Sequence, residues 1–204
     1  AARRGAGEGT AVQLSVVIAA YDAEPWLGAA LDSVLREAPP DAEVIVVDDG
    51  SRDATGAIAR SRSARVRVLR NDAPTGPGRA RTAGARAASG AVVAFHDADD
   101  LVLSGRFSAL QAVLDERPKI DLVFANGARC DGEGRRLGPV IGPRQARRLR
   151  ERVDLDEMLR GGVVYPQAMS IRRERFLALG GFVAERGEDW DFALRAALAL
   201  RMAY

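Results

Sequence analysis

The chain has 204 residues, of which 47% are hydrophobic, and a formal net charge of +2. This composition predicts one globular domain with a sizeable core, and no apolar run resembles a membrane span or a signal peptide. Every basic residue except Lys119 is arginine, spread along the chain without alternating aromatics, which argues against nucleic-acid binding. Cys130 is the only cysteine, which excludes an intrachain disulfide. We expect a cytoplasmic protein, with the inner face of the membrane as an alternative.

The first hundred residues alternate between short apolar strands and helices. Residues 1–12 are expected to form a flexible tail. The pattern predicts strands at 14–20, 43–47, 66–69 and 91–95. Between them we expect a helix that opens at Pro25 and ends before Pro39, a helix at 55–62 and a helix at 78–88. This alternation predicts an α/β fold built on a parallel sheet with right-handed crossovers.

Beyond Asp100 the elements are less regular. We expect strands at 120–125 and 168–171, a hairpin arm at 137–141, a short helix capped by Asp154, a helix at 173–179 and a last helix from Asp189 to the carboxyl end. The helical pattern still runs at Tyr204, so the natural sequence can continue beyond it. The basic run at 144–152 is interpreted as a solvated helix face or loop in preference to a phosphate-binding lid. Residues 13–204 thus form one domain, with a regular half at 13–100 and a mixed half at 101–204.

Two aspartate clusters follow apolar strands. Asp48 and Asp49 close the second strand, and Asp97, Asp99 and Asp100 close the fourth. In open α/β sheets, ligands bind at the carboxyl ends of the strands. Carboxylates that converge there repel one another. A divalent metal ion that also binds a phosphorylated substrate would compensate this repulsion and is the simplest candidate ligand. Strand alternation turns Asp97 and Asp99 to the same side, where they can share a hard cation.

Two common phosphate-binding motifs are excluded. The chain has no glycine-rich turn that ends in Gly-Lys-Ser/Thr, as a P-loop requires. The segment TGPGRAR at 75–81 starts like a dinucleotide fingerprint, but Arg81 occupies the position of the third glycine. A nicotinamide or flavin enzyme is therefore not expected.

Five ordered segments together resemble glycosyltransferase family 2, the inverting nucleotide-sugar transferases of GT-A fold. They are SVVIAAYD at 15–22, VVDDGSRDAT at 46–55, residues 78–90, FHDADD at 95–100, and GGF at 180–182 followed by EDWD at 188–191. Five motifs in order are far more specific than any one of them. The resemblance implies a Rossmann-like, mostly parallel sheet flanked by helices. Residues 13–100 would bind the nucleotide-sugar, and residues 101–204 would form the acceptor half.

The resemblance also implies roles for particular residues. The donor-binding set would be Ala19, Tyr21, Asp22, Asp49, Arg81, Asp97 and Ala98. The metal set would be Asp97, Asp99 and Asp100, with Mn²⁺ or Mg²⁺ as the cofactor. Asp189 would be the general base and Glu188 its catalytic partner, while Asp49 would accept a hydrogen bond from a ring N–H of uracil or a similar base. The family often has asparagine where Asp22 and Thr82 stand.

The implied reaction is a single displacement. A carboxylate takes the proton of the acceptor hydroxyl as it attacks the anomeric carbon opposite the diphosphate, which inverts the configuration. The donor would be a nucleoside-diphosphate sugar, with UDP favoured. The acceptor would be a glycan in polysaccharide biosynthesis, a lipid-linked glycan, a protein or a small molecule. One alternative is a catalytically silent nucleotide-sugar-binding module. Another is a sugar nucleotidyltransferase, which the acidic, glycine-free loop at 20–25 disfavours. For His96 and Trp190 the sequence allows two roles, contact with a ligand or a structural role in packing.

Overall fold

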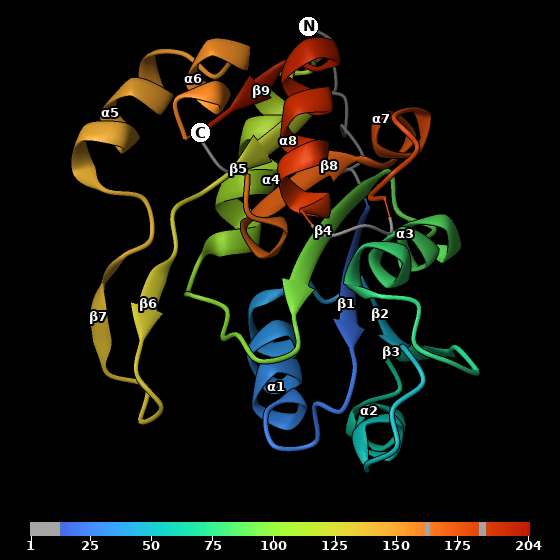
Figure 1. Ribbon diagram of the computed structural model, residues 1–204. Coiled ribbons are helices and arrows are strands. Elements are labelled where there is room, and N and C mark those ends of the chain that lie inside the picture. Colours follow the sequence, from blue (N-terminus) through green and yellow to red (C-terminus); the bar gives the residue numbers. More distant parts are fainter. Residues whose placement is uncertain (1–12, 162–163, 184–186) are drawn as a thin grey trace, which may run out of the picture.

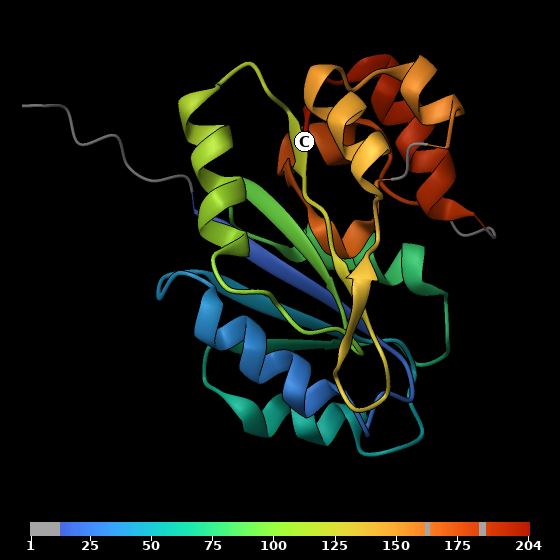
Figure 2. The ribbon, with the colours of Figure 1, turned by 90° about the vertical axis from the view of Figure 1, so that its left-hand side faces the viewer.

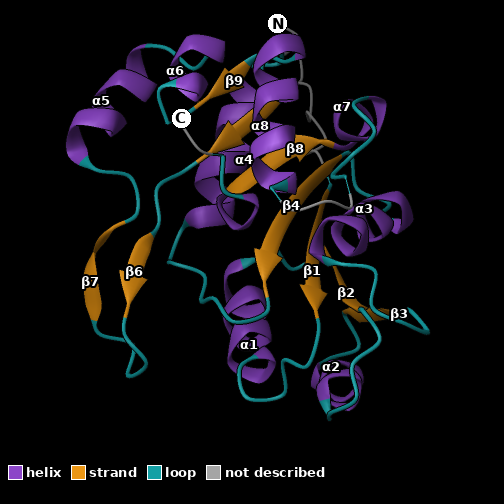
Figure 3. Cartoon of the chain, in the orientation of Figure 1, coloured by secondary structure: helices purple, strands orange, loops and turns teal. Residues whose placement is uncertain are grey.

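The computed structural model describes residues 13–161, 164–183 and 187–204, so the expected tail at 1–12 lies outside the described residues. The first half alternates as predicted (Figure 1 and Figure 3), with β1 (Leu14–Ala20), α1 (Leu27–Glu37), β2 (Glu43–Asp48), α2 (Thr55–Arg62), β3 (Val66–Arg70), α3 (Pro77–Ala87) and β4 (Val92–Asp97). The prediction that the first helix opens at Pro25 is wrong. Residues 24–26 form a turn in which the Trp26 N–H donates to the Ala23 carbonyl at 3.0 Å, and α1 begins after it.

The second half is mixed, as predicted. Its elements are α4 (Arg106–Glu116), β5 (Leu122–Phe124), β6 (Ala128–Cys130), β7 (Arg136–Pro139), α5 (Pro143–Glu151), α6 (Leu155–Leu159), the 3₁₀ turn η1 (Pro166–Ala168), β8 (Met169–Arg172), α7 (Arg173–Ala178), α8 (Glu188–Ala199) and β9 (Met202–Ala203). Asp154 caps α6 by accepting the Glu157 N–H at 3.1 Å, as expected. The prediction of helix up to the carboxyl end is wrong for the last residues. Met202 and Ala203 are buried and pair in parallel with β5, whose edge offers free backbone partners.

The described residues form a seven-stranded sheet in the order β3-β2-β1-β4-β8-β5-β9. The pairs among β1, β2, β3 and β4 are parallel, and β8 runs antiparallel to both β4 and β5. The chain leaves β1 toward β2 and β3, then crosses back to place β4 on the other side of β1. The strand order therefore reverses between β1 and β4, and an open α/β sheet binds its ligand at the carboxyl ends of the strands at such a point.

Helices cover both faces of this sheet (Figure 2). On one face Val16 and Ile18 of β1 pack in a buried cluster with side chains of α1, α2 and α4. On the other face Val17 packs with side chains of α3, α7 and α8. Gly84 lets α3 approach closely, because an added Cβ would lie 2.4 Å from Val17 Cγ1. Among the described residues, no helix combines the length and the apolar character that a membrane crossing requires.

Candidate active site

The carboxyl ends of β2, β1 and β4 bring the two aspartate clusters to one edge of the sheet. In the strand register Ala20 pairs with Asp48, and Ala19 pairs with Asp97. The Asp49 N–H donates to the Ala20 carbonyl at 2.8 Å. Since adjacent strands lie about 4.8 Å apart, the backbones of Asp48 and Asp97 are separated by about 10 Å. The prediction that the two clusters lie at the same edge of the sheet is confirmed.

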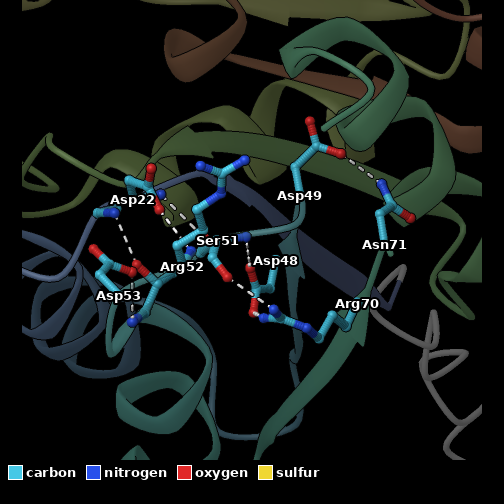
Figure 4. A network of polar contacts seen from close by, with 10 residues as sticks. Asp22, Asp48, Asp49, Ser51, Arg52, Asp53, Arg70 and Asn71 are labelled. Atoms are coloured by element: carbon cyan, nitrogen blue, oxygen red, sulfur yellow. Dashed lines mark hydrogen bonds and ion pairs between the residues drawn. The ribbon is translucent and has the colours of Figure 1, made fainter. Parts of the chain in front are cut away.

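Asp48 and Asp22 shape the loops at this edge (Figure 4). The fully buried Asp48 accepts the Ser51 N–H at 3.0 Å and forms an ion pair with Arg70. Asp22 has a left-handed φ of 45°. Its carboxylate accepts the Arg52 N–H at 2.8 Å, and its own N–H donates to Ser51 Oγ at 3.1 Å. Asp22, predicted to contact the donor, thus ties the loop after β1 to the loop after β2.

Asp49 holds the loop at 71–76. Its carboxylate accepts hydrogen bonds from Asn71 Nδ2 at 2.6 Å, Thr75 Oγ1 at 2.8 Å, the Thr75 N–H at 2.9 Å and the Gly76 N–H at 2.8 Å. Burial alone would raise the pKa of Asp49, but these hydrogen bonds to the charged form outweigh it and lower the pKa. Asn71 and Thr75 were not among the predicted site residues. Their loop follows β3, however, and must therefore reach the same edge of the sheet.

Arg81 of α3 joins the two halves of the site. Its guanidinium lies 2.6 Å from Asp97 Oδ1 and 3.6 Å from Glu188 Oε1. Its Cζ lies 5.8 Å from the centre of the Phe182 ring. The Nε of Arg81 is buried and has no hydrogen-bond partner among the described residues. The structure thus brings together two residues predicted to bind the donor, Arg81 and Asp97, and one predicted to act in catalysis, Glu188.

The segment before α8 packs closely on α3. Thr82 Oγ1 accepts the Phe182 N–H at 2.9 Å and lies 3.3 Å from the Phe182 carbonyl, to which its hydroxyl can donate. A Cβ added to Gly78 would lie 2.5 Å from the Val183 carbonyl oxygen, so only glycine permits this approach. Thr82, where the family often has asparagine, therefore joins the donor half to the acceptor half.

The second aspartate cluster forms a turn. The strand β4 ends at Asp97, and the Asp100 N–H donates to the Asp97 carbonyl at 3.3 Å. Strand alternation therefore does not extend to Asp99, contrary to the prediction; Asp99 is exposed within the turn and Ala98 is buried. Burial, and then the charges of Asp97 and Asp99, raise the pKa of Asp100, while a hydrogen bond with Gln167 of η1 acts in the opposite direction. Gln167 carries no sequence signal that could have linked it to this turn.

His96 supports this turn from inside the protein. Its ring is 2% exposed, with Nε2 at 3.1 Å from the Asp100 carbonyl and Nδ1 at 3.2 Å from Arg106 Nη1. A guanidinium only donates hydrogen bonds, so Nδ1 accepts and Nε2 carries the proton. Burial and the charge of Arg106 lower the pKa of His96 to about 4. Of the two roles left open by the sequence, the structure supports the structural one.

The carboxylates of the turn fit a cation that is shared with a substrate. The described residues contain no group of three or more His, Cys, Asp or Glu side chains placed to hold a metal ion by themselves. Asp97 contacts Arg81, and Asp99 and Asp100 follow it in the same turn. Magnesium is commonly bound by one or two carboxylates together with substrate phosphates, and manganese prefers the same oxygen ligands. The residues present therefore suit a cation whose coordination a diphosphate completes.

The acceptor half contributes the start of α8. Asp189 is half-buried in its first turn, and Asp189 Oδ1 accepts the Trp190 N–H at 2.8 Å. Trp190 is 37% exposed, and Tyr21 in the loop after β1 is 49% exposed. Both aromatic side chains are therefore accessible to a ligand.

Comparison with known proteins places this chain in a family. Residues 15–180 match the model of the family described as Glycosyl transferase family 2. The chain belongs to this family. An uncharacterized glycosyltransferase from Haemophilus influenzae is 29% identical over 185 residues, which cover 89% of this chain and 61% of that protein. The UDP-Glc:alpha-D-GlcNAc-diphosphoundecaprenol beta-1,3-glucosyltransferase WfgD from Escherichia coli is 28% identical over 114 residues, or 55% of this chain and 45% of WfgD.

Two solved structures confirm the predicted GT-A fold. S. aureus TarS 1-349 in complex with UDP superposes with a TM-score of 0.77 at 22% identity, covering 93% of this chain and 56% of TarS 1-349. The mannosyltransferase PcManGT from Pyrobaculum calidifontis, solved with GDP-Man and Mn²⁺, gives a TM-score of 0.71 at 21% identity, covering 96% of this chain and 55% of PcManGT. The chain thus spans at most 61% of the length of these four proteins.

Proposed function

We propose that the chain is the catalytic domain of a metal-dependent, inverting glycosyltransferase that uses a nucleoside-diphosphate sugar. One observation carries the proposal: Arg81 lies 2.6 Å from Asp97 and 3.6 Å from Glu188, so the donor and acceptor halves meet at one guanidinium. The UDP in the TarS structure and the UDP-Glc in the name of WfgD support a UDP-sugar. The Mn²⁺ in the PcManGT structure supports a divalent cation.

In this proposal the loops after β1 and β2 bind the base. Tyr21 is exposed and offers a ring for stacking, while the backbone of Ala19 and the loop tied by Asp22 border the base. Asp49 already accepts four hydrogen-bond donors, so a ring N–H must replace one of them. The side chains of Asn71 and Thr75 can rotate away, whereas the backbone N–H groups stay.

The diphosphate would lie beside Arg81 and the turn after β4. A planar guanidinium presents several donors to phosphate oxygens, and Arg81 has an unpartnered Nε. Asp97 and Ala98 would contact the ribose, and Asp99, with Asp97 and Asp100, would hold Mn²⁺ or Mg²⁺. When bound, the cation neutralises the charge that develops on the leaving diphosphate.

Asp189 would act as the general base. A carboxylate oxygen of Asp189 takes the proton of the acceptor hydroxyl while the hydroxyl oxygen attacks the anomeric carbon, and the diphosphate leaves on the opposite face. No protein nucleophile is needed, so the configuration inverts. Glu188 holds the start of α8 toward Arg81 and thereby positions Asp189.

The test compares the variant Asp99→Ala with Asp41→Ala, which removes an exposed carboxylate away from the site. Transfer and hydrolysis of UDP-sugars are measured with Mn²⁺ and a panel of acceptors. We expect Asp99→Ala to lose about 100-fold or more in turnover and Asp41→Ala to keep the wild-type rate. Unchanged turnover in Asp99→Ala would overturn the metal assignment. Donor binding by the wild type without any turnover would instead support a silent binding module, and pyrophosphate release from a nucleoside triphosphate and a sugar phosphate would support a nucleotidyltransferase.

A further inference from the structure

The helix α5 carries arginines that the proposed reaction does not use. Arg144, Arg147 and Arg150 are exposed along it, and we call them the α5 arginines. Within the described part of the chain, they form no ion pair and no side-chain hydrogen bond. Arg148, by contrast, pairs with Glu157 at 2.9 Å. The α5 arginines are therefore free to meet a partner, while Arg148 fastens α5 to α6.

Positive charge is concentrated at this helix. Residues 143–152 hold five arginines and one glutamate. Arg148 pairs with Glu157, and Arg152 pairs with Asp154 and Asp156, whereas the α5 arginines form no ion pair with any described residue. Surface charges are screened beyond about 10 Å at moderate salt, so a partner at α5 experiences the local charge and not the net charge. Three exposed arginines without an ion pair among the described side chains, carried by one helix, fit a polyanionic surface.

The composition around α5 favours an anionic bilayer over a nucleic acid. The helix is amphipathic, because Ala146 and Leu149 are buried while the α5 arginines face outward. Residues 143–152 include no aromatic side chain on which a base could stack. The neighbouring elements expose Leu137 on β7, at 64%, and Leu159 on α6, at 62%. Leucine can enter a bilayer interface, but it gains nothing from a sugar–phosphate backbone.

The place of α5 in the fold also suits a flat partner. Figure 1 shows α5 at the outer edge of the protein, next to α6 and away from α3 and α7. A shallow pocket of about 390 Å³ is lined by Pro143, Arg144, Arg147 and Arg148. A phosphate group of a lipid can therefore lie between guanidinium groups that project from the same helix.

We propose that α5 is a docking surface for the anionic phospholipid headgroups of a membrane. Each arginine near such a surface contributes about fivefold to the binding constant, so the three α5 arginines contribute about 100-fold. Binding by this patch alone is weak and reversible, because stable anchoring takes a second signal. The surface would hold the domain beside a membrane and bring lipid-linked acceptors within reach.

The test measures cosedimentation of the 204-residue chain with vesicles in the absence of any sugar donor. The vesicles contain phosphatidylcholine alone or phosphatidylcholine mixed with phosphatidylglycerol. The triple variant Arg144→Gln, Arg147→Gln, Arg150→Gln is compared with a control that loses the same charge elsewhere. That control changes exposed residues that form no ion pair with any described residue, Arg117→Gln, Lys119→Gln and Arg201→Gln. Thermal melts confirm that both variants fold.

We expect the wild type to bind the vesicles with phosphatidylglycerol and not those of phosphatidylcholine alone. The α5 variant should bind about 100-fold more weakly, and the control should stay within about threefold of the wild type. Equal losses in the two variants would overturn the proposal, because net charge and not α5 would then decide binding. So would a wild type that ignores the vesicles or prefers a single-stranded oligonucleotide at the same salt. These outcomes leave the transferase proposal untouched, since no turnover is measured.

Discussion

Replacing Arg81 with methionine removes the guanidinium that contacts both Asp97 and Glu188, while an apolar stem remains beside Phe182. The Arg81 side chain is 10% exposed, and the side chains of Asp97 and Glu188 are 21% and 18% exposed. Removing one partner of a fully buried ion pair costs about 3–5 kcal/mol. Water can reach about a fifth of each carboxylate here, so we expect a loss of about 2–3 kcal/mol in the free energy of unfolding. For a chain of this length, that loss lowers the melting temperature by about 5–10 °C.

Urea denaturation measures this loss directly, with Arg117→Met as the control at an exposed arginine that pairs with no carboxylate in the described ranges. Arg81→Lys should lie between the wild type and Arg81→Met, because an ammonium keeps the charge but does not span both carboxylates. In a double-mutant cycle, Arg81→Met and Glu188→Gln should be non-additive by about 0.5 kcal/mol or more. An Arg81→Met protein within about 0.5 kcal/mol of the wild type would refute the reasoning, as would strict additivity of the pair.

Three further predictions concern the loops and turns around the site. Asp49→Asn should lower the free energy of unfolding by about 1–3 kcal/mol at pH 7. Because folding lowers the pKa of Asp49, the charged carboxylate stabilises the protein above the unfolded pKa, and this stabilisation is lost as pH falls through the folded pKa. Urea melts of the two proteins should therefore converge as the pH falls below about 4, and a constant difference would contradict this. His96→Leu should lower the free energy of unfolding by about 1–3 kcal/mol in urea melts. His96→Gln should recover more than half of that loss, because its amide both donates and accepts hydrogen bonds. Equal losses in the two variants would argue against a His96 side chain that bridges the Asp100 carbonyl and Arg106. Gly78→Ala should lower the free energy of unfolding by more than about 1 kcal/mol in thermal melts. The control Gly132→Ala, with nothing within 4 Å of its added Cβ, should stay within about 0.5 kcal/mol of the wild type. Equal effects would count against the tight approach of α3 to the segment before α8.

The regular half of the fold was predictable because its signals are local. The run at Leu14–Ala20 is apolar throughout, as a strand buried on both faces requires, and the structure forms β1 over the same residues. Alternation of such strands with helices then determines a parallel sheet and the edge at which both aspartate clusters lie. The strand β9 could not be predicted in this way. It has two residues, and its pairing with β5 joins segments 80 residues apart, as the bond from the Arg201 N–H to Asp121 also shows.

The candidate site was predictable only in its chemical types and its family motifs. Asp97 was predicted from the end of its strand, and Arg81 and Glu188 from the family resemblance; the structure brings their side chains together. Asp49 accepts hydrogen bonds from the 71–76 loop. This contact depends on the path of that loop back to the edge of the sheet, which the periodicity of the sequence does not predict. The role of His96 was open because a histidine at a strand end gives no information on what lies behind it; the answer is the arginine of α4, ten residues later.

The central claim is that the carboxylates at the ends of β2 and β4 bind one nucleoside diphosphate, Asp49 at its base and Asp97, Asp99 and Asp100 through a divalent cation. The most direct measurement is the thermal unfolding of the wild type, Asp99→Ala and Asp41→Ala with UDP, with Mn²⁺ and with both. Saturation at 100 times the dissociation constant adds about 2.7 kcal/mol, so UDP with Mn²⁺ should raise the wild-type melting temperature by about 5–10 °C. This rise should exceed the sum of the separate shifts, persist in Asp41→Ala and disappear in Asp99→Ala. Equal shifts in all three proteins, or no shift with any nucleoside diphosphate, would contradict the claim.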